Sequence, residues 1–343
     1  MTRGFSKLAV KGIASLFLTL FLLEAVTRLT GVTPPLPKLY RDEIYRPHPI
    51  LPFHLRPSIQ LTAASGTGEF TQTTVHNSVG YRDIEHTPEK PAGTLRILGV
   101  GDSFAYGAGA EFHETYLAVL EQLLNSAPTR SNPVEIIKAG IGGCTPLTER
   151  LLVECEGLAY DPDLILVGFN ETDIFEIHID IEEVRLYEGF LKNAQAKRLG
   201  YTGTWLVLNS HFARLVHSKV SRHAAKKRQR EFDTSPKLVE AAWERIGQEL
   251  GRIGQLAATN GAKAVVCYIP LSLEECELSR DELLRQCSPY GIPVIDTSPY
   301  LLAAQQEGRV YWKRDGHCTP RGYRAVAEAI YDTLKQKGGH LYP

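Results

Sequence analysis

Ile97-Leu98-Gly99-Val100-Gly101-Asp102-Ser103-Phe104 is the stretch that decides the fold, because in it a short apolar run reaches glycine and turns polar at a serine. This apolar run begins at residue 95 and predicts a strand over 95–100. Further apolar runs of similar length follow at 134–139, 164–169, 263–269 and 293–296. Each is nearly all apolar, which is typical of parallel strands covered on both faces. The pattern therefore predicts a buried parallel sheet of about five strands.

Helices are predicted between these strands. Thr145-Pro146 and Thr319-Pro320 each place a capping threonine before a proline, the residue that suits the first helical position. Apolar residues recur at helical spacing over 238–257, and Ser279-Arg280-Asp281-Glu282 has the form of a capping box. Strands that alternate with helices predict an α/β fold of three layers, α/β/α, with a doubly wound, flavodoxin-like parallel sheet.

The first thirty residues have the pattern of a membrane anchor. The run 12–23 holds no charged residue, and basic side chains at Arg3, Lys7 and Lys11 precede it. Counted over 8–26, the segment is long enough to cross a bilayer, and its basic leading end predicts export of the residues after the span. A cleaved signal peptide is the alternative, but 23–28 fits the small-residue cleavage pattern poorly. We expect an uncleaved, single-pass transmembrane helix in the cytoplasmic membrane, with the rest on the extracytoplasmic side, periplasmic or extracellular.

The remaining chain divides by composition. Residues 31–93 are rich in proline and turn formers and predict a spacer followed by an irregular or β-like lead-in. Residues 94–340 hold the α/β pattern, interrupted at about 174–236 by a longer and more polar stretch that we interpret as a helical insertion. Within it, the basic run 222–230 is usually a solvated helix face; contact with anionic lipid or glycan is the alternative.

Composition excludes several classes of protein. The net charge of −1 provides no attraction to nucleic acid, and we find no nucleic-acid motif, zinc-type cysteine spacing or second ligand cluster beside His317. We expect no nucleic-acid partner, no metal and no cofactor; protein partners stay open. Export permits disulfides among the six cysteines. Cys276 with Cys287 is the first pair to consider and Cys144 with Cys318 the second, whereas Cys267 fits a buried thiol.

Polar residues and glycines follow the predicted strands. Ser103 follows the first strand, Gly140-Ile141-Gly142-Gly143 the second and Asn170 the third, while Asp315 and His317 lie beyond the last. Ligands of open parallel sheets bind outside the carboxyl ends of the strands, so one edge collects all of these residues. Gly140 and Gly142 are interpreted as turn residues without a role of their own.

These residue types are the parts of a serine nucleophile site. A serine hydroxyl needs a histidine to take its proton and an acid to orient that histidine, which predicts Ser103, His317 and Asp315 as catalytic residues. The oxyanion formed on attack needs several donors. The backbone N–H groups of Ser103 and Gly143 and the amide of Asn170 are the candidates, and glycine leaves room for the substrate.

At this point the residues resemble the SGNH hydrolases, also called GDSL-type esterases and lipases. Gly101-Asp102-Ser103-Phe104 is similar to the first motif block, 139–143 to the second, Gly168-Phe169-Asn170-Glu171 to the third and Asp315-Gly316-His317 to the fourth. The resemblance covers 94–336. Glu171 stands where the third block usually has aspartate, and the Asp–His spacing is one residue shorter than usual. The stretch 77–83 is also similar to the sequence that precedes the first block in exported bacterial members.

The resemblance implies an exported serine esterase that acts through an acyl-serine on O-acyl esters, acetyl above all, of a small molecule or envelope carbohydrate. An O-acyltransferase to a glycan hydroxyl is the first alternative, since acceptor choice depends on water exclusion and pocket shape. A non-catalytic glycan-binding module is the second, supported only by the short Asp–His spacing. A dinucleotide loop is excluded because Phe104 replaces its third glycine, and a P-loop because no Gly-Lys-Ser/Thr follows.

Overall fold

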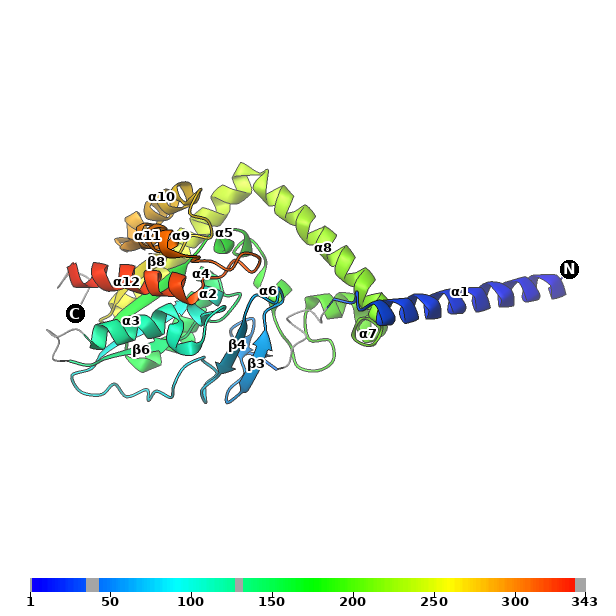
Figure 1. Cartoon of the computed structure of the whole chain (residues 1–343), viewed down its shortest axis with the longest axis horizontal. Helices are drawn as coiled ribbons and strands as arrows, with labels where there is room; N and C mark the ends of the chain where they lie inside the picture. Colours follow the sequence, from blue (N-terminus) through cyan, green and yellow to red (C-terminus); the bar gives the residue numbers. More distant parts are fainter. Residues whose placement is uncertain (1, 35–42, 127–131, 337–343) are drawn as a thin grey trace. The chain divides into compact units, whose positions relative to one another are not determined.

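The computed structural model describes residues 2–34, 43–126 and 132–336, with side chains from residue 10 to 335. The chain forms two compact units (Figure 1). One unit combines residues 1–42 with the insertion Glu182–Thr234, and the other combines Glu43–Ile181 with residues 235–343. The expected insertion at about 174–236 contains the observed inserted part, and the lead-in from Glu43 onward belongs to the unit that holds the sheet.

A parallel sheet of five strands forms the centre of the larger unit, in the order β6-β5-β7-β8-β9. The predicted sheet is confirmed, and every strand begins and ends within a residue of its predicted bounds. The bounds are β5 (Leu95–Gly101), β6 (Val134–Lys138), β7 (Leu164–Phe169), β8 (Lys263–Tyr268) and β9 (Val294–Asp296). β5 and β7 are buried along their whole length, as apolar central strands should be.

Helices cover both faces of the sheet and complete three layers (Figure 1). On one face, α3 (Tyr116–Asn125), α11 (Ser298–Glu307) and α12 (Pro320–Gln336) pack over alternate strand residues such as Ile97, Leu166 and Val265. On the other lie α4 (Pro146–Cys155), α9 (Pro236–Thr259) and α10 (Cys276–Cys287). Shorter helices are α2 (Ser103–Tyr106), α5 (Thr172–Glu176), α6 (Ile181–Val184), η2 (Phe112–Glu114), η3 (Gly157–Tyr160) and η4 (Ser288–Tyr290).

Two threonine-proline starts are found as predicted, since α4 begins at Pro146 after Thr145 and α12 begins at Pro320. The prediction that a capping box at Ser279 begins a helix is wrong. α10 already begins at Cys276, so Ser279 lies inside the helix. Local pattern alone misplaces this start because Cys276 and Leu283 bury the first turns against the core, and burial overrides the propensity for a cap.

Neither of the two cysteine pairs considered forms a disulfide, because all six cysteines are free. Cys276 and Cys287 mark the two ends of α10. At 1.5 Å rise per residue they stand roughly 16 Å apart, whereas bridged Cα atoms lie within about 7 Å. Cys144 and Cys318 are separate buried thiols, and burial raises the pKa of both. Cys267 is buried in β8, as predicted.

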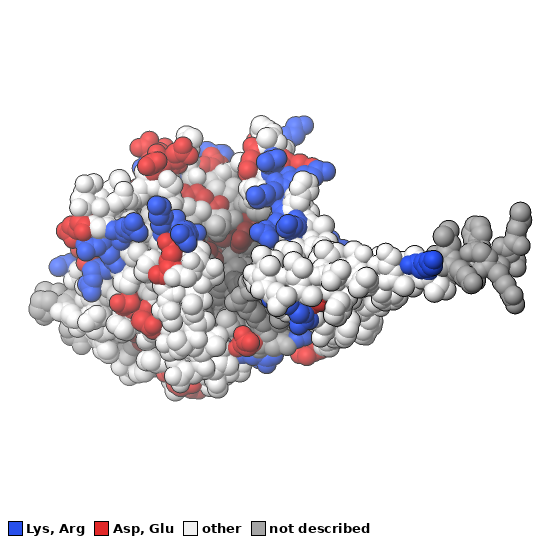
Figure 2. All heavy atoms as spheres, turned by 45° about the vertical axis from the view of Figure 1, so that its right-hand side comes forward, with Lys and Arg blue, Asp and Glu red and all other residues white. Residues whose placement is uncertain are grey.

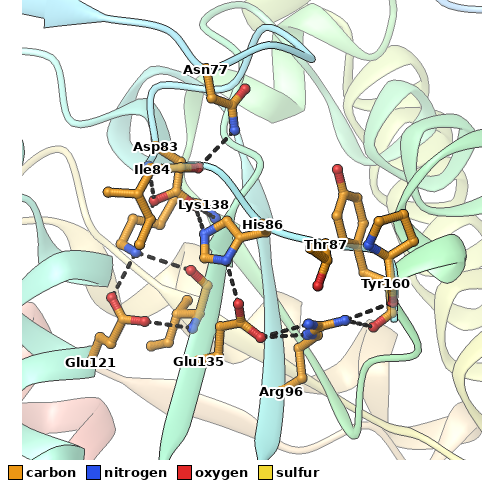
Figure 3. A network of polar contacts seen from close by, with 12 residues as sticks. Asn77, Asp83, Ile84, His86, Thr87, Arg96, Glu121, Glu135, Lys138 and Tyr160 are labelled. Carbon is orange, nitrogen blue, oxygen red and sulfur yellow. Dashed lines mark hydrogen bonds and ion pairs between the residues drawn. The ribbon is translucent and has the colours of Figure 1, made fainter. Parts of the chain in front are cut away.

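The lead-in is more ordered than the sequence indicates. It forms two hairpins, β1 (Tyr45–Arg46) with β2 (His54–Leu55) and β3 (Gln60–Ala64) with β4 (Thr71–Val75). The segment after these hairpins, which holds Asp83 and His86, is joined to the sheet by buried ion pairs (Figure 3). Asp83 accepts from Lys138 Nζ at 3.1 Å and from His86 Nε2 at 2.9 Å. His86 Nδ1 also lies 2.5 Å from Oε1 of Glu135, which precedes Lys138 on β6.

In its described residues, the smaller unit contains three long helices, α1 (Thr2–Thr30), α7 (Ala194–Asn209) and α8 (His211–Asp233). Within α1, Val10–Thr30 has a mean hydropathy of 1.7, and it is long and apolar enough to cross a membrane. A signal sequence near the N-terminus would have the same composition. The surface of α1 from Val10 to Thr30 carries few charges, whereas lysine and arginine side chains gather on α8 (Figure 2).

Candidate active site

Ser103 opens α2 at the carboxyl end of β5. Asp102 caps this short helix by accepting the Phe104 N–H at 2.8 Å, and the helix ends at Gly107 in a left-handed conformation. Phe104 is buried beneath the turn, which holds the serine at the edge of the sheet. Ser103 itself is half-buried and keeps some exposed surface.

His317 joins Ser103 to Asp315. Its Nε2 lies 2.8 Å from Ser103 Oγ, and its Nδ1 lies 2.5 Å from Asp315 Oδ1. A carboxylate can only accept, so Nδ1 carries the proton and Nε2 is free to accept the serine proton. The imidazole is 25% exposed and its ring centre lies 5.1 Å from that of Phe104.

The short Asp–His spacing is accommodated by a tight turn. Gly316 has a φ of +87°, a region that side chains rarely enter, and its N–H donates to the Trp312 carbonyl at 3.0 Å. Trp312 N–H donates in turn to the His317 carbonyl at 2.9 Å. The glycine therefore lets two residues that are two positions apart direct their side chains to one another.

Glu69, at the tip of the β3–β4 hairpin, holds this turn from outside. Its Oε2 accepts the backbone N–H groups of Arg314 at 2.7 Å and Asp315 at 2.8 Å. Desolvation raises the pKa of Glu69, but these two donors, the Thr67 hydroxyl and the charge of Arg314 together keep the pKa below its usual range. Sequence reasoning missed Glu69, because nothing local links a polar hairpin to a turn 245 residues away.

Asn170 follows β7 and is oriented by both of its amide atoms. Its Oδ1 accepts from the Thr172 N–H at 2.9 Å and from the Thr172 hydroxyl at 2.7 Å. This leaves Nδ2 to donate, and it does so to Asp102 Oδ2 at 2.9 Å, beside Ser103. Since an amide nitrogen carries two hydrogens, the same group can serve a second acceptor.

The loop after β6 completes the edge. The Gly140 backbone lies so close to α2 that a Cβ there would stand 2.3 Å from the peptide atoms joining Ala105 and Tyr106. Gly140 is therefore a packing requirement of the serine-bearing turn and more than the plain turn residue that the sequence indicated. Ile141 N–H donates to the Gly101 carbonyl at 3.0 Å, and Gly143 is exposed two residues further along the loop.

Beneath the site lie three buried carboxyl groups, Asp102, Glu149 and Asp173, each at most 3% exposed. Asp173 Oδ2 accepts the Asn170 N–H at 3.2 Å. Within the described parts of the chain, neither oxygen of Glu149 has a hydrogen-bond partner. Burial and the neighbouring Asp102 carboxyl raise the pKa of Glu149 well above its usual range, which favours the protonated form of this side chain.

Glu171 acts away from the serine. Its carboxylate accepts from the Tyr268 hydroxyl and, at 2.8 Å, from the Leu271 N–H, and it thereby ties the loop after β8 to that after β7. Burial raises the pKa of Glu171, although the tyrosine hydroxyl opposes this. No group of three or more histidine, cysteine or acidic side chains in the described chain is arranged to hold a metal ion.

No family model and no curated protein matches the chain. Solved structures do. A two-domain esterase active on acetylated mannans is 15% identical with a TM-score of 0.44; the match covers 74% of this chain and 52% of the esterase, so the chain spans about half its length. A member of the lipolytic G-D-S-L family from Veillonella parvula is 16% identical, with a TM-score of 0.40, over 71% of this chain and 99% of its own.

An acetyl-xylooligosaccharide esterase from Geobacillus is 12% identical with a TM-score of 0.43, over 73% of this chain and 96% of the esterase.

Proposed function

We propose that the protein is a serine ester hydrolase in which Ser103 is the nucleophile. The observation that carries this proposal is the continuous hydrogen-bonded line from Ser103 Oγ through His317 to Asp315. Such a line is what a serine needs to become nucleophilic at neutral pH. It favours turnover over the interpretation as a binding module, whose only basis was the short Asp–His spacing.

The proposed reaction runs through an acyl-enzyme. Ser103 Oγ bonds to the acyl carbon while His317 Nε2 takes the hydroxyl proton, and Asp315 stabilises the imidazolium. The tetrahedral adduct then breaks its bond to the alcohol, which receives the proton from His317. Water attacks the acyl-serine with His317 again as base, so that the carboxylic acid leaves and Ser103 regains its proton.

The negative oxygen of the adduct needs preorganised donors. We assign this role to the Ser103 N–H, the Gly143 N–H and the Asn170 amide, of which losing one typically costs about 3 kcal/mol of transition-state stabilisation. The fixed orientation of Asn170, held by Thr172, supports its place in this set. Asp102 both accepts from Asn170 and caps α2, so it positions the amide relative to the serine.

We further propose that the substrates are small O-acyl esters, such as acetyl esters of envelope carbohydrate, and that α1 anchors the enzyme in the cytoplasmic membrane with its site outside. The apolar segment Val10–Thr30 and the basic residues before it support the anchor. The resemblance of the sequence blocks to exported esterases supports the ester. Transfer of the acyl group to a sugar hydroxyl uses the same acyl-serine and differs only in the acceptor.

Ser103→Ala tests the nucleophile. The variant should lose p-nitrophenyl acetate hydrolysis and labelling by a fluorophosphonate probe, while Ser126→Ala, at an exposed helix end, should keep both. Unchanged turnover in Ser103→Ala would remove the assignment. Mass spectrometry of products formed from an acetylated donor and an oligosaccharide then separates hydrolysis, which releases acetate, from transfer, which acetylates the sugar.

A further inference from the structure

The apolar helix α1 is built into the inserted helices. Glu24, near its C-terminal end, accepts from the Ser210 hydroxyl at 2.7 Å and from the N–H groups of His211 at 3.0 Å and Phe212 at 2.9 Å. These donors are the first turn of α8, whose N-terminus favours a negative charge. Arg28, paired with Glu24 at 2.6 Å, also donates to the Asn209 carbonyl at 3.1 Å.

These contacts fix the height of the α7–α8 junction along α1. The segment Val10–Thr30 is the candidate span, and Glu24 and Arg28 are the charged residues in its last two turns. Charged side chains near the end of a span lie at the headgroup level, where water and protein donors satisfy them. Asn209 and Ser210 therefore lie at that level too, with Leu20 about 6 Å deeper toward the hydrocarbon.

An apolar groove opens at this junction. Its volume is about 700 Å³, and it runs from Leu20 of α1 along side chains of α7 and α8. The apolar residues of its wall include Leu199, Trp205, Leu206, Phe212, Val216 and Val220. Several are open to solvent in the protein alone: Trp205 is 55% exposed and Val220 62%. Apolar surface of this extent costs free energy in water and needs an apolar occupant.

We propose that lipid acyl chains of the bilayer occupy this groove, so that the α7–α8 junction is a membrane-embedded foot with Trp205 at the interface. The inference rests on the proposed anchoring by α1. Continuity favours lipid as the occupant, because the groove begins at Leu20, on a surface that the bilayer already covers. Tryptophan and tyrosine concentrate at membrane interfaces, and α7 presents Tyr201, 69% exposed, one turn before Trp205.

Quenching by brominated lipid tests the foot in the full-length protein. The chain has three tryptophans, of which Trp243 is buried and Trp312 donates to the Gly109 carbonyl. In vesicles of phosphatidylcholine brominated near the middle of one acyl chain, wild-type emission should fall below that in unbrominated vesicles. Trp205→Phe should abolish this loss, and Trp243→Phe should retain it. Esterase turnover of Trp205→Phe should match that of wild type, which shows that the variant folds.

Flotation on a density gradient distinguishes failure of the proposed foot alone from failure of the proposed membrane anchor. Protein that floats with the vesicles but shows equal emission in both lipids overturns the foot and leaves the anchor in place. Protein that stays at the bottom overturns anchor and foot together. Loss of self-association in Trp205→Phe, without any lipid quenching, would make a second copy of the chain the occupant and overturn the lipid assignment.

Discussion

At the residue scale, the site combines side chains that are exposed for chemistry with side chains that are buried for support. Ser103 and His317 are half-buried and keep some exposed surface, whereas the carboxyl groups Asp102, Glu149 and Asp173 beneath them are buried. Burial disfavours the charged forms of the three carboxyl groups and raises the pKa of each. The Asp102 carboxyl further raises the pKa of Glu149, and both of these groups raise that of Asp173. The cluster therefore has a cost in stability that depends on pH.

Glu149→Gln should relieve that cost. In the folded protein the pKa of Glu149 lies above its ordinary value of 4.5, so above pH 4.5 the native state holds a proton that the unfolded chain has released. Wild-type stability must then fall as pH rises, with a slope of up to about 1.4 kcal/mol per pH unit from this group. The free energy of unfolding of Glu149→Gln, measured by denaturant titration from pH 5 upward, should exceed that of wild type by a growing margin.

The exposed Glu274→Gln is the matched control and should follow wild type at every pH. Parallel curves for wild type and Glu149→Gln would mean that Glu149 is ionised in the native state and has a partner.

Sequence patterns located the candidate residues that the structure brings together at one edge of the sheet, but not the residues that support them. Ser103, Asn170 and His317 follow strands whose apolar runs are evident, and the order of strands brings their ends to one edge. The burial of Glu149 could not be predicted from the sequence, because an acidic residue in the first turn of a helix is ordinarily exposed to solvent and interacts with the helix dipole. Its burial depends on the packing of α4 against α9, which no local pattern contains.

At the element scale, the long apolar strands were predictable and the polar hairpin was not. β5 and β7 are buried throughout, so composition alone identifies them. β3 and β4 are mostly exposed or half-buried, and their pairing replaces the irregular lead-in that the prolines suggested. The hairpin matters because it carries Glu69 to the Asp315 turn and because Phe70 packs 5.4 Å from Trp312, centre to centre.

Glu69→Ala should lower kcat by about 10- to 100-fold, as expected when a catalytic group is displaced by roughly 1 Å. Without the Glu69 carboxylate, the backbone N–H groups of Arg314 and Asp315 lose their acceptor. Asp315, the partner of His317, then moves, while the groups that contact the substrate keep their positions. KM for p-nitrophenyl acetate should change little. Glu69→Gln keeps an oxygen that accepts both N–H groups and should restore kcat to near the wild-type value. Equal losses in both variants would show that the charge, and not the position of the turn, matters.

At the scale of the whole molecule, each unit is assembled from segments far apart in the chain. The sheet unit closes with α12, and the smaller unit joins α1 to helices that begin some 180 positions later. The sequence did not predict that α1 packs with the inserted helices. From the sequence, Glu24 was interpreted as the residue that ends an apolar run. The structure shows that its carboxylate also accepts hydrogen bonds from Ser210, His211 and Phe212.

Glu24→Ala should loosen α8 from α1 without affecting the sheet unit. Removing a side chain that caps a helix N-terminus costs about 1 kcal/mol, which makes local opening roughly fivefold more frequent. Limited proteolysis of the full-length protein should therefore cut near the α7–α8 junction about fivefold faster than in wild type. Thr19→Ala is the matched control and should be cut at the wild-type rate, because the Thr19 hydroxyl donates to the Ser15 carbonyl of its own helix. Esterase turnover should be equal in all three proteins, because the hydrogen-bond partners of the Glu24 carboxylate lie in α1 and at the α7–α8 junction. Identical cleavage rates for Glu24→Ala and wild type would show that α1 and α8 are held together by their apolar faces, with Glu24 contributing nothing.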